Sequence, residues 1–390
     1  MSKLSRNSTQ PDLAQQISAV PLGLYVHFPW CVRKCPYCDF NSHEANGELP
    51  AREYVDALLR DLEQEAPTLA GRQIESVFFG GGTPSLISGR EVGRVIDELV
   101  ARDWLAPNAE ITLEANPGAV ERQYFADYVS AGVNRVSLGV QTFDETALKV
   151  LGRIHDTDDI QRAWELLVQL AVPRLNIDLM HGLPGQTPEL AVADLDQALR
   201  MNPGHISWYQ LTIEPNTRFY NQPPTLPDED KLEAIEQAGR ERLQADGYDQ
   251  YEISAWARPG HASQHNRNYW TFGDYIGIGA GAHGKLTTES GSVRTQRTRM
   301  PEAYLRAILG GRQVNQIDTD ALPFEYMLNA LRLREGVPET LFTARTGLTP
   351  DALEPQLTQL RNKGLIHSDR HALTDLGWRF YNDAVGAWVN

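Results

Sequence analysis

The chain has 390 residues, of which 41% are hydrophobic and 22% charged, enough for a large buried core and a smaller second domain. Its formal net charge of −15 gives no long-range attraction for phosphate backbones or anionic lipid, so a nucleic-acid-binding protein is disfavoured. No apolar run approaches the roughly 20 residues that span a bilayer, and the polar start over 1–16 lacks the layout of a signal peptide. We therefore expect an intracellular, cytoplasmic protein.

The first 20 residues are rich in Ser, Gln and Asn and predict a flexible tail. From Leu22 onward, short β-branched runs alternate with longer stretches of helical periodicity, which indicates repeated βα units around a parallel sheet. The predicted strands are 22–28, 76–79, 111–114, 135–140, 174–180 and 205–213. The predicted helices between them are 53–65, 89–102, 122–131, 158–170 and 188–201. The expected fold class is α/β, a partial (β/α)6 barrel.

The βα rhythm ends after the prolines at 223, 224 and 227 and a predicted helix over 228–246. Residues 264–284 then form a dense aromatic and glycine segment. Further on, the pattern predicts helices over 323–333, 339–346, 350–363 and 375–389, with short strands at 366–368 and 372–374. We expect a barrel domain over 21–290 and a mostly helical, winged-helix-like domain over 291–390. The acidic balance argues against DNA reading by this second domain.

All three cysteines of the chain, Cys31, Cys35 and Cys38, lie within one eight-residue stretch. An odd, clustered set indicates metal or redox chemistry rather than a disulfide framework. The Cys-x3-Cys-x2-Cys spacing suits a 4Fe-4S cluster, because three thiolates leave one iron open. That iron can be chelated by S-adenosylmethionine (SAM), whose sulfonium then accepts an electron. A zinc site with His27 or His43 as fourth ligand stays open as an alternative.

Chemically unusual residues follow the predicted strands. Among them are the cysteine loop after the first strand, Gly80–Pro84 after the second, Glu114, Gln141, and Asp178 with His181. The carboxyl ends of barrel strands form the active-site face, so these residues are expected to meet there. Gly80, Gly81 and Gly82 would allow a ligand to approach the backbone closely, although a glycine cluster alone also fits an ordinary loop.

Six motifs follow one another along the chain: YVHFPWCVRKCPYCDF, FGGGTPS, EANPG, SLGVQTF, LGRIH and NIDLMHGLPGQT. As an ordered set they resemble the radical SAM branch that contains oxygen-independent coproporphyrinogen III oxidase and the HemW haem chaperone family. The resemblance extends from about Leu22 to the C-terminus. It implies Cys31, Cys35 and Cys38 as cluster ligands. It also implies a SAM site formed by Tyr25, Tyr37, Gly81, Gly82, Thr83, Glu114, Gln141, Arg153, Asp178 and, as a weaker match, Thr212.

Departures from the oxidase pattern favour the HemW side of this branch. Phe40 stands where the oxidase has a further cysteine, and only about twenty residues precede the first strand. The segment HNRNYW at 265–270 resembles the HNxxYW signature of the HemW family, and the C-terminal domain looks like its characteristic one. The resemblance implies a third cofactor, haem, with His265 as the favoured ligand and aromatic neighbours against the macrocycle. His181, His261 and His283 are alternative ligands.

The resemblance therefore implies a haem chaperone that transfers haem to haem-requiring respiratory or membrane proteins. The alternative is an enzyme, a coproporphyrinogen III oxidase that decarboxylates propionates by radical chemistry. A nucleic-acid modifier is disfavoured by the acidic balance and by the lack of an Arg/Lys-rich stripe. Whether the protein is an enzyme, forms a homodimer, or lies peripherally at the inner face of the membrane stays open.

Overall fold

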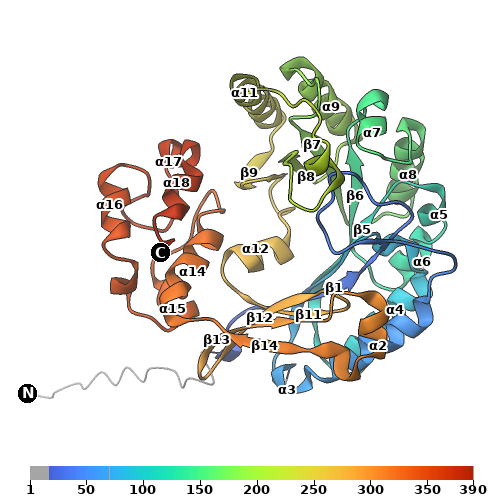
Figure 1. The fold of residues 1–390 in the computed structure, drawn as a ribbon, viewed down its shortest axis with the longest axis horizontal. Helices are drawn as coiled ribbons and strands as arrows, with labels where there is room; N and C mark the ends of the chain where they lie inside the picture. Colours follow the sequence, from blue (N-terminus) through green and yellow to red (C-terminus); the bar gives the residue numbers. More distant parts are fainter. Residues whose placement is uncertain (1–16, 70, 390) are drawn as a thin grey trace, which may run out of the picture.

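The computed structural model describes residues 17–69 and 71–389 (Figure 1). Most of the predicted N-terminal tail thus lies outside the described residues. Val20, at the end of that tail, is buried, and its carbonyl accepts a 2.8 Å hydrogen bond from Arg72. Within the described part of the chain, no helix is both long enough and apolar enough to cross a membrane.

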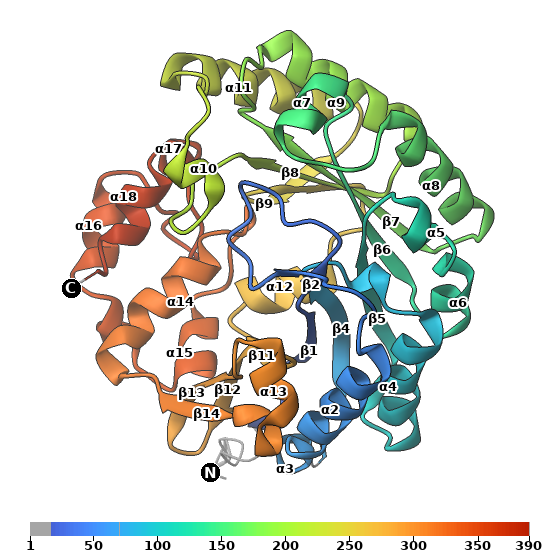
Figure 2. The same cartoon turned by 45° about the vertical axis from the view of Figure 1, so that its right-hand side comes forward.

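A single curved sheet of 12 strands forms the centre of the molecule, in the order β14-β13-β12-β11-β1-β4-β5-β6-β7-β8-β10-β9. Its strands are β1 (Leu22–Phe28), β4 (Ile74–Gly81), β5 (Leu105–Ala115), β6 (Arg135–Gln141), β7 (Arg174–His181), β8 (His205–Gln210), β9 (Asp249–Glu252), β10 (Ala255–Ala257), β11 (Asp274–Ile278), β12 (His283–Thr288), β13 (Gly291–Gln296) and β14 (Gln313–Gln316). The six predicted strands are β1 and β4 to β8, which pair in parallel as neighbours. The partial barrel is confirmed, and Figure 2 shows it open on one side.

The aromatic and glycine segment supplies one more parallel strand. It begins with α12 (Gln264–Trp270) and continues into β11, which pairs with β1 in the register Leu22↔Asp274. From β11 the sheet turns antiparallel through β12, β13 and β14. The sheet therefore continues past residue 290, where the sequence predicted a domain boundary, and that division stays a prediction.

Amphipathic helices cover the outer face of the barrel (Figure 2). They are α2 (Ala51–Glu63), α3 (Ala66–Leu69), α4 (Gly89–Ala101), α5 (Ala119–Arg122), α6 (Phe125–Ser130), α7 (Glu145–Val150), α8 (Thr157–Gln169), α9 (Pro188–Met201) and α11 (Glu229–Ala245). The short α10 (Arg218–Asn221) lies instead beside the cysteine loop, where the Phe219 N–H donates a 2.9 Å hydrogen bond to the Pro36 carbonyl. Each long helix turns one apolar stripe inward, as Val92, Val95 and Leu99 of α4 do, because that burial drives its packing on the sheet. The apolar residues of the parallel strands alternate, as Leu22, Leu24 and Val26 do in β1, so they cover the face that lies under the helices. The inner face carries polar side chains, among them Thr112 and Asn176.

The C-terminal part is mostly helical and flanks the open side of the barrel (Figure 1). Its helices are α14 (Leu322–Ala330), α15 (Thr340–Thr346), α16 (Gln356–Asn362), α17 (Asp375–Arg379) and α18 (Tyr381–Gly386). The preceding helix α13 (Pro301–Arg306) packs against α2 instead, through Tyr304 and Tyr54. The predicted wing strands meet only at the isolated bridge Ile366↔Leu373. Tyr251, Ala257 and Phe272 of the barrel contribute to the same core as these helices, so the two parts share one interface.

A buried charged cluster joins α2 to the segment after β13. The guanidinium of Arg297 donates hydrogen bonds to Asp61 (2.6 Å) and Glu65 (2.7 Å), and all three side chains are at most 1% exposed. Arg312 donates a further 2.7 Å bond to Glu65, and the Tyr304 hydroxyl donates to Asp61 (2.9 Å). Charges this deep persist only when paired, so the cluster fixes how the last strands meet the first helix.

Candidate functional site

The three cysteines lie on a short loop that directly follows β1. Cys31 ends β2 (Trp30–Cys31), which pairs with β3 (His43–Glu44) and so closes the loop. The Lys34 ammonium donates to the carbonyls of Phe40 (3.2 Å) and Ser42 (3.1 Å) inside the loop. The cysteines are therefore presented by a backbone that the protein itself holds in place.

Burial makes the thiolate forms of Cys31 and Cys38 unfavourable without a cation. It raises the pKa of Cys31 to about 11, although Thr83 and Ser42 hydrogen bonds oppose this, and it also raises the pKa of Cys38. Arg153 Nη1 lies 3.6 Å from the Cys35 sulfur. Such a donor set becomes stable as thiolates when a metal centre compensates the charge.

The geometry disfavours His27 as the fourth ligand of a zinc site, whereas the Nε2 of His43 has no hydrogen-bond partner within the described chain. Both ring nitrogens of His27 are engaged, Nδ1 with the Tyr25 hydroxyl and Nε2 with the Asn41 carbonyl, each at 2.9 Å. Among residues 17–69 and 71–389, no three His, Cys, Asp or Glu side chains converge on a point where a single metal ion would bind. The thiols of a cubane bind separate iron atoms, so they need not meet at one point.

A pocket of about 150 Å³ lies above the cysteines, at the carboxyl ends of the barrel strands. It brings together most of the predicted site residues, namely Cys31, Cys35, Cys38, Tyr37, Gly81, Gly82, Thr83, Glu114, Gln141, Arg153 and Asp178. The glycine turn is a close-fitting part of its wall, because a Cβ on Gly82 would lie 2.6 Å from the Trp30 carbonyl oxygen. Gly81 has φ +121°, a left-handed conformation that favours glycine.

Two half-buried carboxyl groups, Glu114 of β5 and Asp178 of β7, line this pocket. Burial, together with the nearby Asp178, raises the pKa of Glu114 to about 8, against a 3.2 Å hydrogen bond from the Gly81 N–H. Burial also raises the pKa of Asp178, while the Ser137 hydroxyl (2.8 Å) and the Asn176 amide (2.7 Å) oppose the shift. Both groups have acceptor capacity left for a hydroxyl-bearing ligand.

Arg153 is half-buried beside the cysteines and has unused donor capacity. Its Nη2 donates to Asn116 Oδ1 and, at 3.0 Å, to the Gly139 carbonyl, whereas its buried Nε has no partner. An orphaned guanidinium donor at a cluster loop fits a ligand that carries a carboxylate.

Sequence reasoning missed two residues of this pocket. Asn116, which holds Arg153, lies inside the EANPG motif and could have been found there. Tyr209, near the end of β8, donates a 2.6 Å hydrogen bond to Gln141 Oε1. Nothing in the sequence distinguished Tyr209 from an ordinary strand aromatic. Gln141 itself has φ +71°, a strained value for a residue with a side chain.

Three predicted site residues lie elsewhere. Tyr25 lines a neighbouring, larger cavity, and Thr212 is exposed beyond the end of β8. His265 is only 1% exposed, with Nδ1 2.9 Å from the Ser76 hydroxyl and Nε2 2.8 Å from the Tyr269 hydroxyl. Because both ring nitrogens are occupied, His265 supports Tyr269 and is not free to ligate iron. Its expected role as haem ligand does not fit this geometry.

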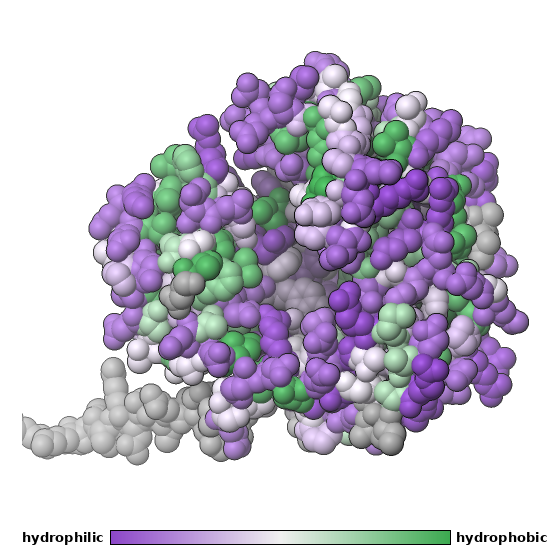
Figure 3. Space-filling view, viewed as in Figure 1, coloured by the Kyte–Doolittle hydropathy of each residue, from purple (hydrophilic) through white to green (hydrophobic). Residues whose placement is uncertain are grey.

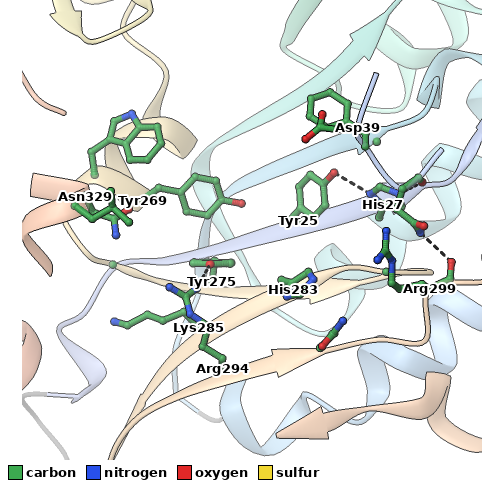
Figure 4. Close-up of a pocket in the computed structure, with 18 of the residues that line it drawn as sticks. Tyr25, His27, Asp39, Tyr269, Tyr275, His283, Lys285, Arg294, Arg299 and Asn329 are labelled. Carbon is green, nitrogen blue, oxygen red and sulfur yellow. Dashed lines mark hydrogen bonds between the residues drawn. The ribbon is translucent and has the colours of Figure 1, made fainter. Parts of the chain in front are cut away.

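The larger cavity has a volume of about 820 Å³ and lies between the barrel and α14. Figure 3 shows the molecule hollowed between these two parts. Aromatic side chains form much of its wall: Tyr25, Phe40, Tyr269, Trp270, Phe272 and Tyr275. Cationic groups also reach it, and Figure 4 shows Arg294 of β13 and Arg299, just after that strand, on either side of His283. Phe40, Gly81 and Glu114 line both this cavity and the cluster pocket, so the two adjoin.

Comparison with known proteins agrees with this geometry. The Radical SAM superfamily model matches residues 25–198, and the HemN C-terminal domain model matches residues 317–380. The heme chaperone HemW of Escherichia coli is 50% identical over 371 residues, covering 94% of this chain and 97% of that protein. The chain belongs to the HemW family. The heme chaperone HemW of Bacillus subtilis is 32% identical over 94% of this chain and 98% of its own length.

The fold of this HemW family member also resembles a solved structure. Coproporphyrinogen III oxidase (HemN) from Escherichia coli has a TM-score of 0.79 at 22% identity, over 96% of this chain and 92% of that one. At this identity the likeness shows the fold alone. Membership of the radical SAM superfamily implies a 4Fe-4S cluster and SAM as cofactors, and the thiol loop, the glycine wall and the orphaned Arg153 donor fit both.

Proposed function

We propose that this protein binds haem in the 820 Å³ cavity and transfers it to haem-requiring proteins. The observation that carries this proposal is an aromatic, partly cationic cavity adjoining a cluster pocket, in a chain whose relatives are named heme chaperones. Its volume lies within the range of about 300–1,000 Å³ that is typical of sites for small organic ligands. Aromatic walls offer the dispersion contacts that a flat macrocycle needs.

We propose the following roles for the cluster pocket. Cys31, Cys35 and Cys38 hold the 4Fe-4S cluster, which when bound supplies one-electron chemistry beside the SAM sulfonium. Gly82 and Thr83 leave room for the methionyl end, and the Arg153 guanidinium pairs its carboxylate. Glu114, Gln141 and Asp178 accept hydrogen bonds from the nucleoside part, with Tyr37 packed at the loop.

The two pockets share part of one wall, so the cluster site can influence haem binding in the neighbouring cavity. A ligand that moves Phe40 or Glu114 from one side changes the shape of the other side, because both residues belong to both walls. We propose that occupancy of the cluster pocket regulates how tightly haem is held. The proposal has three further parts. The protein hands haem to an acceptor protein, it works in the cytoplasm at the inner face of a membrane, and it forms a homodimer.

The test is a haem titration of anaerobically reconstituted full-length protein, with iron and sulfide measured on the same sample. We expect one haem per chain by absorbance, and an affinity that changes when SAM is added. A matched Cys35→Ser sample, which should lack the cluster, tests whether haem binding depends on it. Absence of haem binding by the loaded wild type would overturn the proposal.

The same protein preparation can be used to distinguish a haem chaperone from a coproporphyrinogen III oxidase. Anaerobic incubation with coproporphyrinogen III, SAM and a reductant would produce vinyl groups if the chain decarboxylated propionates. We expect no vinyl product under conditions in which haem is bound. The oxidase reading has the weaker support, because the 22% identical oxidase shares the fold, whereas the relatives of higher identity are named chaperones.

A further inference from the structure

The large cavity holds an imidazole and a guanidinium that the protein itself leaves without partners. From this arrangement we propose that His283 is the axial ligand of the haem iron and that Arg299 pairs a haem carboxylate. The inference rests on the proposed function, because it requires haem to enter this cavity.

Only two histidines line the cavity among the described residues, His27 and His283. Both ring nitrogens of His27 are engaged by Tyr25 and Asn41, so it has no lone pair to offer. The His283 imidazole, at the start of β12, makes no hydrogen bond to any residue in the described ranges. A neutral imidazole with a free nitrogen is a common protein ligand for haem iron.

The other histidines that sequence reasoning considered are placed less favourably. His265 is buried with both nitrogens occupied. His181 lines a separate cavity of about 260 Å³ and lies against the Trp208 ring, at a centroid distance of 4.2 Å. His261 lies beside Gly204, at the amino end of β8 and away from the aromatic cavity.

The cationic side chains that line the cavity differ in whether they already pair with an acidic side chain of the protein. Arg294 donates to the Tyr275 hydroxyl (2.9 Å) and pairs with Glu325. The buried Lys285 ammonium pairs with Asp274 at 3.2 Å. By contrast, Arg299 is exposed, and its guanidinium forms no ion pair with any described acid. Arg299 is therefore the cation with donors left for an incoming carboxylate.

The two groups lie where one haem would meet both. Arg294 and Arg299 are near enough to His283 for their charges to act on its imidazole, and Figure 4 shows His283 between them. Above them, Tyr269 points toward Tyr25 across the cavity. A flat macrocycle in this cavity would thus meet His283 at its iron and Arg299 at a propionate on one side. On the opposite side it would meet the tyrosine rings. Phe40, 61% exposed, adds apolar surface that haem would cover.

The test uses reconstituted full-length protein and ferric haem, with His283→Ala and Arg299→Ala compared against His367→Ala and Arg306→Ala. The two control residues lie outside the cavity. We expect His283→Ala to shift the Soret band, to weaken haem binding about tenfold or more, and to recover the wild-type spectrum when free imidazole is added. We expect Arg299→Ala to weaken haem binding while leaving the affinity for haem dimethyl ester, which lacks the carboxylates, equal to that of wild type.

Some results would overturn the inference and leave the proposed function standing. These are wild-type haem affinity and spectrum in His283→Ala, or equal losses of haem and its dimethyl ester in Arg299→Ala. If wild-type protein bound no haem at all, both the inference and the proposed function would fail.

Discussion

The backbone N–H of Gly81 donates a 3.2 Å hydrogen bond to Glu114 Oε2 in the wall shared by the two cavities. It is the only hydrogen bond found for the half-buried Glu114 carboxyl in the described part of the chain. The glycine turn and the β5 carboxyl are thereby linked, although they lie 33 residues apart in the sequence.

The free energy of unfolding of the apoprotein should depend on pH through the ionisation of Glu114. Burial raises its folded-state pKa to about 8 from a usual value of 4.5, so the folded state binds this proton more tightly than the unfolded state. The contribution is fully present below about pH 4.5 and is lost as pH rises to about 8. In urea unfolding between these limits, wild type should lose more stability than Glu114→Gln, with a difference on the order of 4 kcal/mol at most. Parallel pH profiles for the two proteins would show that Glu114 is normally ionised.

Gly82 should be intolerant of the smallest side chain. A Cβ there would lie 2.6 Å from the Trp30 carbonyl, so Gly82→Ala must displace the cluster loop and should cost roughly 1–3 kcal/mol. We expect less iron and sulfide per chain after reconstitution. The matched control is Gly386→Ala in α18, where a Cβ meets nothing within 4 Å and stability should change by about 0.5 kcal/mol or less. Full cluster occupancy in Gly82→Ala would contradict the close fit.

His265→Ala should destabilise the fold without changing the haem ligand. The imidazole bridges Ser76 and Tyr269 and stacks on Phe78 at 5.0 Å, so its loss leaves two hydroxyls unpaired around a cavity. We expect a cost of about 2–4 kcal/mol in chemical denaturation. Haem that still binds should keep the wild-type Soret position. A changed Soret band with unchanged stability would instead restore His265 as the ligand.

Arg297→Met should be among the most destabilising single changes outside the pockets. It would leave Asp61 and Glu65 as buried, poorly compensated charges, a situation that typically costs about 3–5 kcal/mol. The surface change Arg162→Met, at a side chain 53% exposed, should cost about 1 kcal/mol or less. Similar urea midpoints for the two variants would show that the buried cluster is not needed for stability.

The sequence predicted the barrel well because its strands alternate with helices and are rich in β-branched residues. The site was predicted largely because the pocket residues follow strand ends, which the βα pattern locates. The placement of His265 could not be predicted, since its partner Ser76 lies 189 residues away and only the folded chain joins them. Strand β11 was not predicted from the sequence for a related reason. Its glycines make it read as a loop, and pairing with β1 supplies its order.

The barrel and the C-terminal helices share one apolar interface, and this has a consequence for any shortened version of the chain. Every thiol that would hold the cluster lies near the start of the chain, whereas Leu328 and Asn329 of α14 line the 820 Å³ cavity from the far end of the sequence. Cutting the chain before α14 would strip Tyr251 and Phe272 of their packing and leave them facing water. Such a shortened protein would keep its sulfur ligands but lose the enclosure for a macrocycle, and it would gain a surface prone to aggregation.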